Sequence, residues 1–480
     1  MESDFAEPTT GEPAHLPPPL PEPDRRPAWW AWPLIWLVPV GLIAAQYLVP
    51  AAETEASQQQ DLSLLAVLQF QSQLIIAMDG LQSAEARRQL ASLENYATDD
   101  ATTAALATVH GFIGLDDGGR EAVDLMLARR REIPGADVAF LERVGSAIVE
   151  GVDEAGREAL RGRLGWFANL PGVPGDPEAP PGGDQIRSRA SVVVMLTGLA
   201  VMAAVVAIFT GAVLLLIATL RRVQGRLQVA FDPARQPAGV FLESFALFLV
   251  TMAVGNVGSW TLHWLVQPTV ALGGLVLALC WPRLRGWGWR ESRLALGWHR
   301  GRGVWREMAA GVTGYLAMLP LAVMGVAASA ILMALAGLFD GLGAAPDGAA
   351  PAVEAAAAAQ SPTPTPVTHP AVGWMLGGWT AKVAVFILAA IMAPLVEETF
   401  FRGAFFRSLR RNRGLLVSGL LNGLIFAALH PQGWLAIPAL TAMGLGFALI
   451  REWRDSLIAP VVAHAINNGV LIGGLALVLQ

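Results

Sequence analysis

Residues 383–402 read VAVFILAAIMAPLVEETFFR, an apolar run that ends in two adjacent carboxylates and an arginine. Ionisable side chains are costly inside a membrane, so groups kept there usually face the protein interior and serve a function. Two further clusters follow on separate apolar segments: Phe426 with His430, and His464 with Asn468. Together the clusters hold two acids, two histidines, an amide and an arginine, a set that could activate water and hold an oxyanion.

The composition of the whole chain predicts an all-α polytopic membrane protein. Of its 480 residues, 54% are hydrophobic and only 15% are charged, with a mean hydropathy of +0.48, whereas soluble domains carry about 25% charged residues. The formal net charge of -6 indicates no nucleic-acid partner. The single cysteine, Cys280, excludes an intrachain disulfide framework and a cysteine-rich zinc site.

Apolar segments long enough to cross a bilayer predict about nine transmembrane helices. They are residues 31–50, 190–220, 239–258, 263–281, 308–338, 373–403, 414–430, 434–451 and 457–478. The arginines gather at alternate ends of these segments, which predicts a cytoplasmic N-terminus by the positive-inside rule. We therefore expect a multi-pass protein of a bacterial cytoplasmic membrane. The arginines from Arg407 to Arg413 are interpreted as a membrane-surface face.

The composition also divides the chain into sections. Residues 1–30, rich in Pro and Glu, are expected to be a disordered tail before a first transmembrane helix at 31–50. Residues 51–189 are predicted to be an extracytoplasmic helical insert with a Pro/Gly linker, because apolar residues recur there at helical spacing. The insert is either a spacer or a substrate- or partner-binding unit. Transmembrane helices and loops fill 190–372, and the three clusters lie in 373–478.

Helix geometry brings the three clusters to a similar depth in the membrane. Residues 412–414 are predicted to form the tip of an antiparallel hairpin, because glycine ends helices. Glu397 and His430 each lie about 16 residues from that tip, so both reach the same depth. His464 lies about ten residues into the last span, which allows all clusters to face one cavity open to the cytoplasm.

The spacing within the first cluster separates its two acids. Glu398 and Arg402 are four residues apart, so they share a helix face and can pair. Glu397 points about 100° away and is free to face the cavity. A lone intramembrane glutamate or histidine is more often a structural hydrogen-bonding group, and the Glu398–Arg402 pair alone could be an interfacial salt bridge. Three depth-matched clusters are harder to explain by packing.

The other two clusters also repeat at four-residue spacing. Phe426 and His430 share a helix face, where the phenyl ring can brace the imidazole. His464 and Asn468 share a face on the last span, where their N–H groups could hold a developing oxyanion.

In this order the clusters resemble the CPBP intramembrane proteases, which include the type II CAAX prenyl endopeptidases and the bacteriocin-processing and self-immunity proteins of the Abi type. The family pattern is E-E-x-x-x-R, F-x-x-x-H and H-x-x-x-N on successive helices. The residues that match it here are Glu397, Glu398, Arg402, Phe426, His430, His464 and Asn468. The resemblance covers about residues 373–478, and the insert at 51–189 is a departure from the family that leaves the substrate open.

The resemblance implies an endopeptidase that cleaves a membrane protein or peptide substrate within the lipid bilayer. It implies that Glu397 and His430 activate a water, and that His464 and Asn468 stabilise the oxyanion. The remaining matched residues, Glu398 and Arg402, would hold the end of their helix.

A second version of the mechanism places a divalent metal such as zinc at the same site. Glu397, His430 and His464 would then be its ligands, and the fourth position would hold the water. The chain lacks the H-E-x-x-H motif of ordinary zinc proteases. The sequence leaves the metal-dependent and metal-free versions open.

Two other functions compete with proteolysis. A bacteriocin-immunity or partner-binding membrane protein could use the same scaffold without cutting, but the intact motifs favour an enzyme. A transporter is a weaker alternative, because the hydropathy pattern has no inverted repeat.

Overall fold

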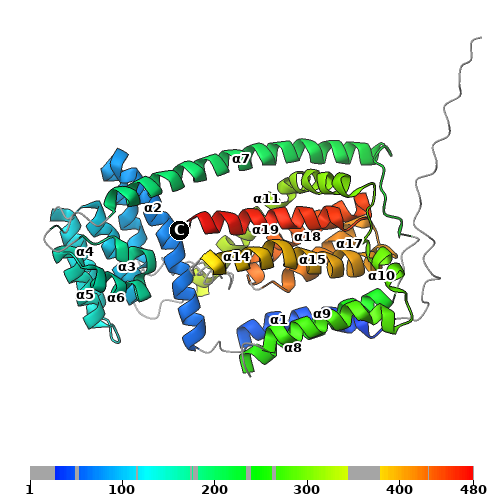
Figure 1. The fold of residues 1–480 in the computed structure, drawn as a ribbon, viewed down its shortest axis with the longest axis horizontal. Helices are drawn as coiled ribbons and strands as arrows, with labels where there is room; N and C mark the ends of the chain where they lie inside the picture. Colours follow the sequence, from blue (N-terminus) through cyan, green and yellow to red (C-terminus); the bar gives the residue numbers. More distant parts are fainter. Residues whose placement is uncertain are drawn as a thin grey trace, which may run out of the picture.

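The computed structural model describes residues 28–48, 53–114, 117–172, 176, 182–233, 239–261, 266–343, 379–430 and 432–478. The elements named in these ranges are helices throughout. Most of the predicted N-terminal tail and much of the Pro/Gly linker fall outside the described residues, as do residues 344–378. Figure 1 shows the resulting all-helical architecture.

Each predicted span coincides with a helix. These are α1 (Ala31–Leu48), α7 (Gly183–Val223), α8 (Val240–Thr261), α9 (Val266–Leu284), α11 (Val304–Gly343), the run from α14 to α16 (Trp379–Arg410), α17 (Leu415–Ala428), α18 (Ile437–Arg454) and α19 (Ile458–Val478). Within the described residues, 5 helices are long and apolar enough to cross a membrane, and shorter apolar helices occupy the other predicted spans. The chain is an all-α integral membrane protein with several spans.

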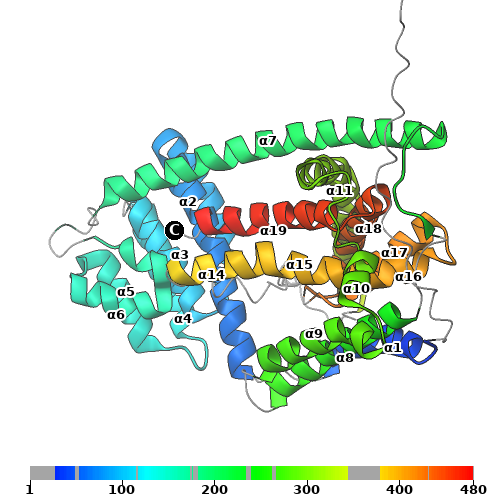
Figure 2. The same ribbon diagram turned by 45° about the vertical axis from the view of Figure 1, so that its right-hand side comes forward.

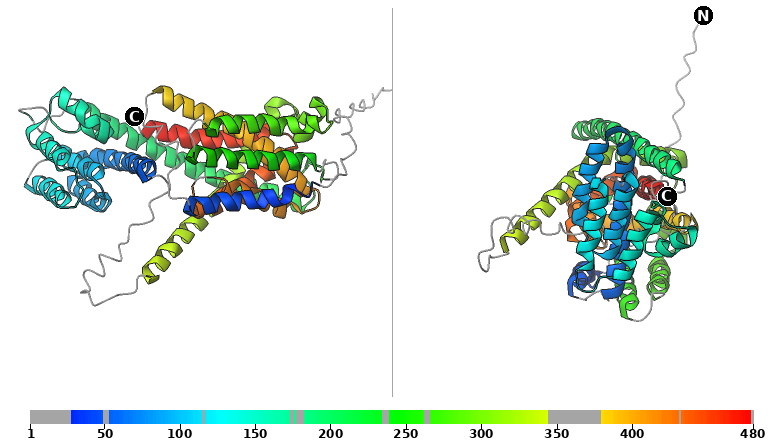
Figure 3. Two further views of the ribbon diagram at one scale, coloured as in Figure 1. Left: turned by 90° about the horizontal axis from the view of Figure 1, so that it is seen from below. Right: turned by 90° about the vertical axis from the view of Figure 1, so that its left-hand side faces the viewer.

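The predicted insert is a bundle of helices at one end of the molecule (Figures 1 and 3). Its elements are α2 (Glu53–Leu93), η1 (Glu94–Tyr96), α3 (Asp100–Ile113), α4 (Asp117–Arg131), α5 (Val138–Glu150), α6 (Glu154–Leu164) and η2 (Gly165–Asn169). Side chains such as Leu68, Leu106, Leu141 and Leu160 have no exposed surface and form its hydrophobic core. The bundle therefore buries apolar surface of its own.

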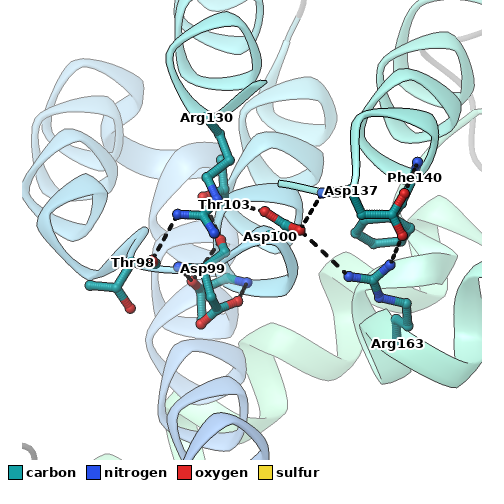
Figure 4. A network of polar contacts seen from close by, with 9 residues as sticks. Thr98, Asp99, Asp100, Thr103, Arg130, Asp137, Phe140 and Arg163 are labelled. Carbon is teal, nitrogen blue, oxygen red and sulfur yellow. Dashed lines mark hydrogen bonds and ion pairs between the residues drawn. The ribbon is translucent and has the colours of Figure 1, made fainter. Parts of the chain in front are cut away.

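A polar network joins the helices of the bundle (Figure 4). The carboxylate of Asp100 accepts hydrogen bonds from Arg130 Nε at 2.6 Å and from the backbone N–H of Asp137 at 2.8 Å. Arg163 donates to the Asp137 carboxylate at 2.7 Å and lies 3.7 Å over the ring of Phe140. These contacts connect α3, α4, α5 and α6 beside the core.

Helix α7 runs from the bundle along the membrane part (Figure 2). Its two buried residues are Ala190, which lies in the bundle core, and Gly211. Gly211 approaches the carbonyl oxygen of Leu316 on α11 so closely that a Cβ would not fit between them. A second junction buries Ala66 of α2 in one cluster with Val385 of α14. The bundle is therefore connected to the membrane helices at two places.

The segment that carries the glutamates departs from a regular α-helix. It consists of α14 (Trp379–Ile387), the π-helix η4 (Leu388–Met392), α15 (Ala393–Glu398), the π-helix η5 (Thr399–Phe405) and α16 (Phe406–Arg410). An asparagine side chain donates to a carbonyl in each π-helix: Asn468 to Ala389 and Asn422 to Phe401, both at 2.8 Å. Single π-helical turns often lie at functional sites. The helix predicted here is present, but apolar periodicity does not reveal where i→i+5 bonding replaces i→i+4.

The predicted hairpin tip is observed between α16 and α17. Gly414 precedes α17, and its carbonyl accepts the backbone N–H of Ser418 at 3.0 Å. Beyond the tip, α17 packs closely on α18, because an added Cβ on Gly423 would lie 2.5 Å from the carbonyl oxygen of Thr441. This contact requires glycine at that position.

Candidate active site

The two adjacent glutamates at the end of α15 occupy different environments. The side chain of Glu398 has no exposed surface, whereas 26% of the Glu397 side chain is exposed. Successive helical residues point about 100° apart, so one carboxylate enters the protein while the side chain of its neighbour stays partly exposed, with a buried Oε2 atom. The separation predicted from spacing is therefore observed.

The buried carboxylate of Glu398 connects two helices. Its Oε1 atom lies 2.9 Å from Arg402 Nη1 and 2.9 Å from His464 Nδ1 on α19. A carboxylate that pairs with a guanidinium accepts hydrogen bonds, so Nδ1 of His464 carries a proton. The other ring nitrogen, Nε2, then lies 3.7 Å from Oε2 of Glu397.

Arg402 is fully buried and is held by groups from three helices. Its Nη2 atom donates to the carbonyl oxygen of Gly444 at 3.0 Å, and its guanidinium lies 4.8 Å from the ring centre of Phe426 and 5.1 Å from that of Phe447. Burying a guanidinium is costly unless a counter-charge and hydrogen bonds compensate for lost water. The carboxylate, the carbonyl and the aromatic faces supply that compensation.

His430 lies just after the C-terminal end of α17. Its Nδ1 atom is 2.6 Å from the carbonyl oxygen of Phe426, which can only accept, so Nδ1 carries the proton. The lone pair on Nε2 of the neutral imidazole remains available as a base. The Phe426 ring lies 4.3 Å from the His430 ring and 5.8 Å from the His464 ring. The phenyl ring thus contacts both histidine rings and links the second cluster to the third.

Asn468 lies beside the first π-helix. Its Nδ2 atom donates to the carbonyl of Ala389 at 2.8 Å, and its Oδ1 atom accepts from Asn467 at 3.2 Å. One of its two amide hydrogens is left for another acceptor. In addition to any contact with substrate, Asn468 therefore anchors α19 to the glutamate-bearing segment.

The sequence did not predict two contacts of this site. The bond between Glu398 and His464 spans 66 positions, and no local spacing indicates it. Asn422 was also missed, although it lies four residues before Phe426 and the same four-residue spacing would have placed it on the face of that cluster.

The interpretation of Arg407 to Arg413 as a membrane-surface face was wrong for two of the arginines. Arg407 is only 2% exposed and donates to Asp455 at 3.2 Å, and Arg410 makes two hydrogen bonds to Glu452 at 2.9 and 2.7 Å. Both acids lie at the end of α18, far along the chain, so the arginine run alone did not reveal them. Beside them, burial lowers the pKa of His299 despite the nearby carboxylate of Asp455.

The metal-dependent version of the mechanism, with Glu397, His430 and His464 as ligands, stays a prediction. No group of three His, Cys, Asp or Glu side chains that could hold a metal ion is found in the part of the chain that the structure describes. His464 Nδ1 is bonded to Glu398, and the Nδ1 atom of His430 faces a backbone carbonyl. The Nε2 atoms of both histidines are left free, and histidines that ligate a metal commonly hold their other ring nitrogen in this way.

Comparison with known proteins confirms the resemblance drawn from the motifs. Residues 379–470 match the family of Rce1-like type II CAAX prenyl endopeptidases. The chain is 32% identical over 98 residues to the membrane-embedded CAAX protease MroQ of Staphylococcus aureus, which covers 19% of this chain and 39% of that protein. It is 27% identical over 88 residues to the putative membrane peptidase YdiL of Bacillus subtilis, covering 18% and 36%. No solved structure matches the chain.

The matches are confined to the C-terminal part of this protein. The chain spans less than two fifths of the length of these relatives. The matched family segment contains Glu397, Glu398, Arg402, His430, His464 and Asn468.

Proposed function

We propose that this protein is an intramembrane endopeptidase that hydrolyses peptide bonds in a membrane protein or peptide substrate. The observation that carries the proposal is the hydrogen-bonded series Arg402–Glu398–His464, which ends beside the accessible carboxylate of Glu397. The match of residues 379–470 to a family of endopeptidases supports the same reaction class.

Glu398 is the orienting group of this proposal. Because its Oε1 atom accepts from His464 Nδ1, it fixes the tautomer with the proton on Nδ1. The same bond fixes the ring orientation in which Nε2 faces Glu397. Arg402 holds the carboxylate in one position through its hydrogen bond of 2.9 Å. A carboxylate that fixes a histidine in this way is a recurring arrangement in hydrolases, where it stabilises the imidazolium that forms during the reaction.

Glu397 is the general base. Its carboxylate takes a proton from a water molecule, whose oxygen attacks the scissile carbonyl carbon and forms a tetrahedral intermediate. The Nε2 lone pair of His430 accepts the second hydrogen of that water and orients it. The proton taken by Glu397 then passes to the leaving nitrogen as the C–N bond breaks, giving a carboxylic acid and an amine.

The oxyanion of the intermediate needs hydrogen-bond donors. The free amide hydrogen of Asn468 is one donor, and His464 Nε2 is a second in molecules whose His464 carries a proton on both ring nitrogens before the substrate binds. Removing one such donor from a hydrolase typically lowers kcat by about 10²–10³.

Orientation and location are also part of the proposal. The arginine-rich turn between α16 and α17 would face the cytoplasm of a bacterium, with the N-terminus on the same side. The helical insert within residues 51–189 would then lie outside the cell. The section boundaries predicted from composition stay predictions.

The proposal is tested by comparing protein termini in cells that express the wild-type chain, Glu397→Gln or His430→Ala. A matched control is Glu121→Gln, which changes an exposed glutamate of the insert. We expect new termini in wild-type and control cells and none in the two site variants. Identical termini in all four, at equal membrane abundance, would contradict proteolysis and favour the partner-binding alternative.

A further inference from the structure

Hydrolysis inside a membrane requires water at a buried centre, and one group of buried side chains has hydrogen-bonding capacity that the protein does not use. Its members have no exposed surface, and each has a polar atom without a hydrogen-bond partner among the described residues. The atoms are Glu398 Oε2, Arg402 Nε, Ser418 Oγ and Asn422 Oδ1. We call these four side chains the polar seam.

The seam has members on both arms of the hairpin formed by α15–α16 and α17. Glu398 and Arg402 are four residues apart on one arm, and Ser418 and Asn422 are four apart on the other, so each pair shares a helix face. Asn422 Nδ2 donates to the carbonyl of Phe401 at 2.8 Å and joins the two arms beside Arg402. Each four-residue step covers about 6 Å along a helix.

The two ends of the seam differ in exposure. Ser418 lies in the first turn of α17, and its backbone N–H bonds to Gly414, an exposed residue of the hairpin turn. At the other end, Glu398 bonds to His464, which faces Glu397. The seam therefore leads from the exposed turn to the centre of the candidate site.

The walls around the seam are apolar. Phe401, Phe405 and Ile425 are each at most 3% exposed and lie in one hydrophobic cluster on the same two arms. A buried polar group without a partner costs about 1–3 kcal/mol, and folded proteins commonly satisfy such groups with ordered water. Four such groups within an apolar wall would be a large cost without a compensating role.

We propose that the polar seam is the path by which water reaches the site and by which protons exchange with the aqueous phase at the hairpin turn. This inference rests on the proposed hydrolytic function. It assigns Ser418 and Asn422 as positioning residues for water, since neither contacts Glu397 or the histidines directly.

The first test measures water access without any proteolytic assay. In a Cys280→Ser background, Ser418→Cys is compared with Ala427→Cys, an apolar position on the same helix that is 1% exposed. Aqueous silver ion is the probe, because it reacts with the thiolate, which forms only where water reaches the thiol. We expect Ser418→Cys to react at least about tenfold faster; equal rates would overturn the proposal.

The second test separates a role in water delivery from a role in packing. The Ser418 hydroxyl has no partner among the residues that the structure describes, so Ser418→Ala removes an unsatisfied group and should leave the Tm unchanged or higher. If the seam delivers water, Ser418→Ala lowers kcat several-fold with KM unchanged, while Ser418→Thr keeps the hydroxyl and retains kcat. Unchanged kcat in Ser418→Ala would overturn the proposal. A wild-type chain without proteolysis would contradict the proposed function, and the silver measurement would still decide the seam.

Discussion

Two buried glutamate–arginine pairs lie in the membrane part, and they differ in how completely they are satisfied. In the pair of Glu307 on α11 with Arg454 on α18, both carboxylate oxygens accept from the guanidinium, at 2.7 and 2.9 Å. In the pair of Glu398 with Arg402, one hydrogen bond of 2.9 Å joins them, and Glu398 Oε2 and Arg402 Nε have no partner in the described part of the chain.

The difference teaches how to read buried charge in this protein. Residue types and burial are the same in both pairs, since both glutamates have no exposed surface. In the satisfied pair, both carboxylate oxygens of Glu307 on α11 accept hydrogen bonds from Arg454 on α18, which fits a structural role. The incompletely satisfied pair can form further hydrogen bonds, to a histidine or to water, and can take part in proton transfer. It lies within residues 379–470, which match the endopeptidase family.

The largest expected effect comes from making both pairs apolar. Replacing a buried ion pair by hydrophobic residues of similar volume is often neutral or stabilising, by about 1–4 kcal/mol. We expect Glu307→Leu with Arg454→Met to fold and to keep its cleavage rate. Glu398→Leu with Arg402→Met should fold as well but lose at least about 100-fold in cleavage rate, because His464 loses its orienting group.

Thermal unfolding and cleavage assays of the two double variants check this contrast. Full activity of the Glu398 and Arg402 double variant would show that this pair is as structural as the other. If both double variants fold and both lose cleavage activity, the two glutamate–arginine pairs do not differ in role.

A smaller effect is expected at a buried titratable group in the insert. Burial, reinforced by the charge of Arg87, lowers the pKa of His110 from 6.5 to about 4, although Glu94 lies 3.3 Å from its Nε2 atom. Between pH 4 and pH 6.5, His110 therefore binds a proton more readily in the unfolded state than in the folded state. The insert should therefore have its full stability above pH 6.5 and lose up to about 3 kcal/mol as the pH falls toward 4.

Hydrogen exchange of the α3 and α5 amides at pH 7.5 and pH 5, corrected for intrinsic exchange rates, measures this loss. His110→Gln has no imidazole to titrate and is the control, so its pH dependence should be much weaker. A wild-type insert whose protection is the same at both pH values would contradict the assignment.

The smallest expected effect concerns the packing that holds Arg402. Gly423→Ala would place a Cβ 2.5 Å from the Thr441 carbonyl and separate α17 from α18, at a cost of about 1–3 kcal/mol. Gly473→Ala on α19 meets no atom within 4 Å and should be neutral or slightly stabilising. Comparison of the two Tm values checks the contrast; an equal Tm would mean that α17 and α18 can move apart freely.

Much of the fold could be predicted because lipid imposes a simple rule on helix length and apolarity. The helix positions and the hairpin turn follow from that rule and from glycine. The accessible position of Glu397 and the pairing of Glu398 with Arg402 follow from helical spacing. These features are local, so a single sequence specifies them.

The remaining features depend on contacts between distant segments. The bond from Glu398 to His464, the burial of Arg407 against Asp455 and the π-helical turns arise from packing between helices. No pattern within one segment indicates which carboxylate a distant arginine will meet. The arginine run therefore looked like a membrane-surface face, although part of it is internal.

Helix α7 has a consequence for how this chain can change in length. It is buried at Ala190 in the insert and at Gly211 against α11, and no break in the helix separates these two points. Adding one residue between them would rotate the insert by about 100° and shift it by about 1.5 Å relative to the membrane helices. Insertions and deletions in this interval are therefore expected to be tolerated only when they add or remove close to a whole number of helical turns. Only then does the insert keep its orientation relative to the membrane helices.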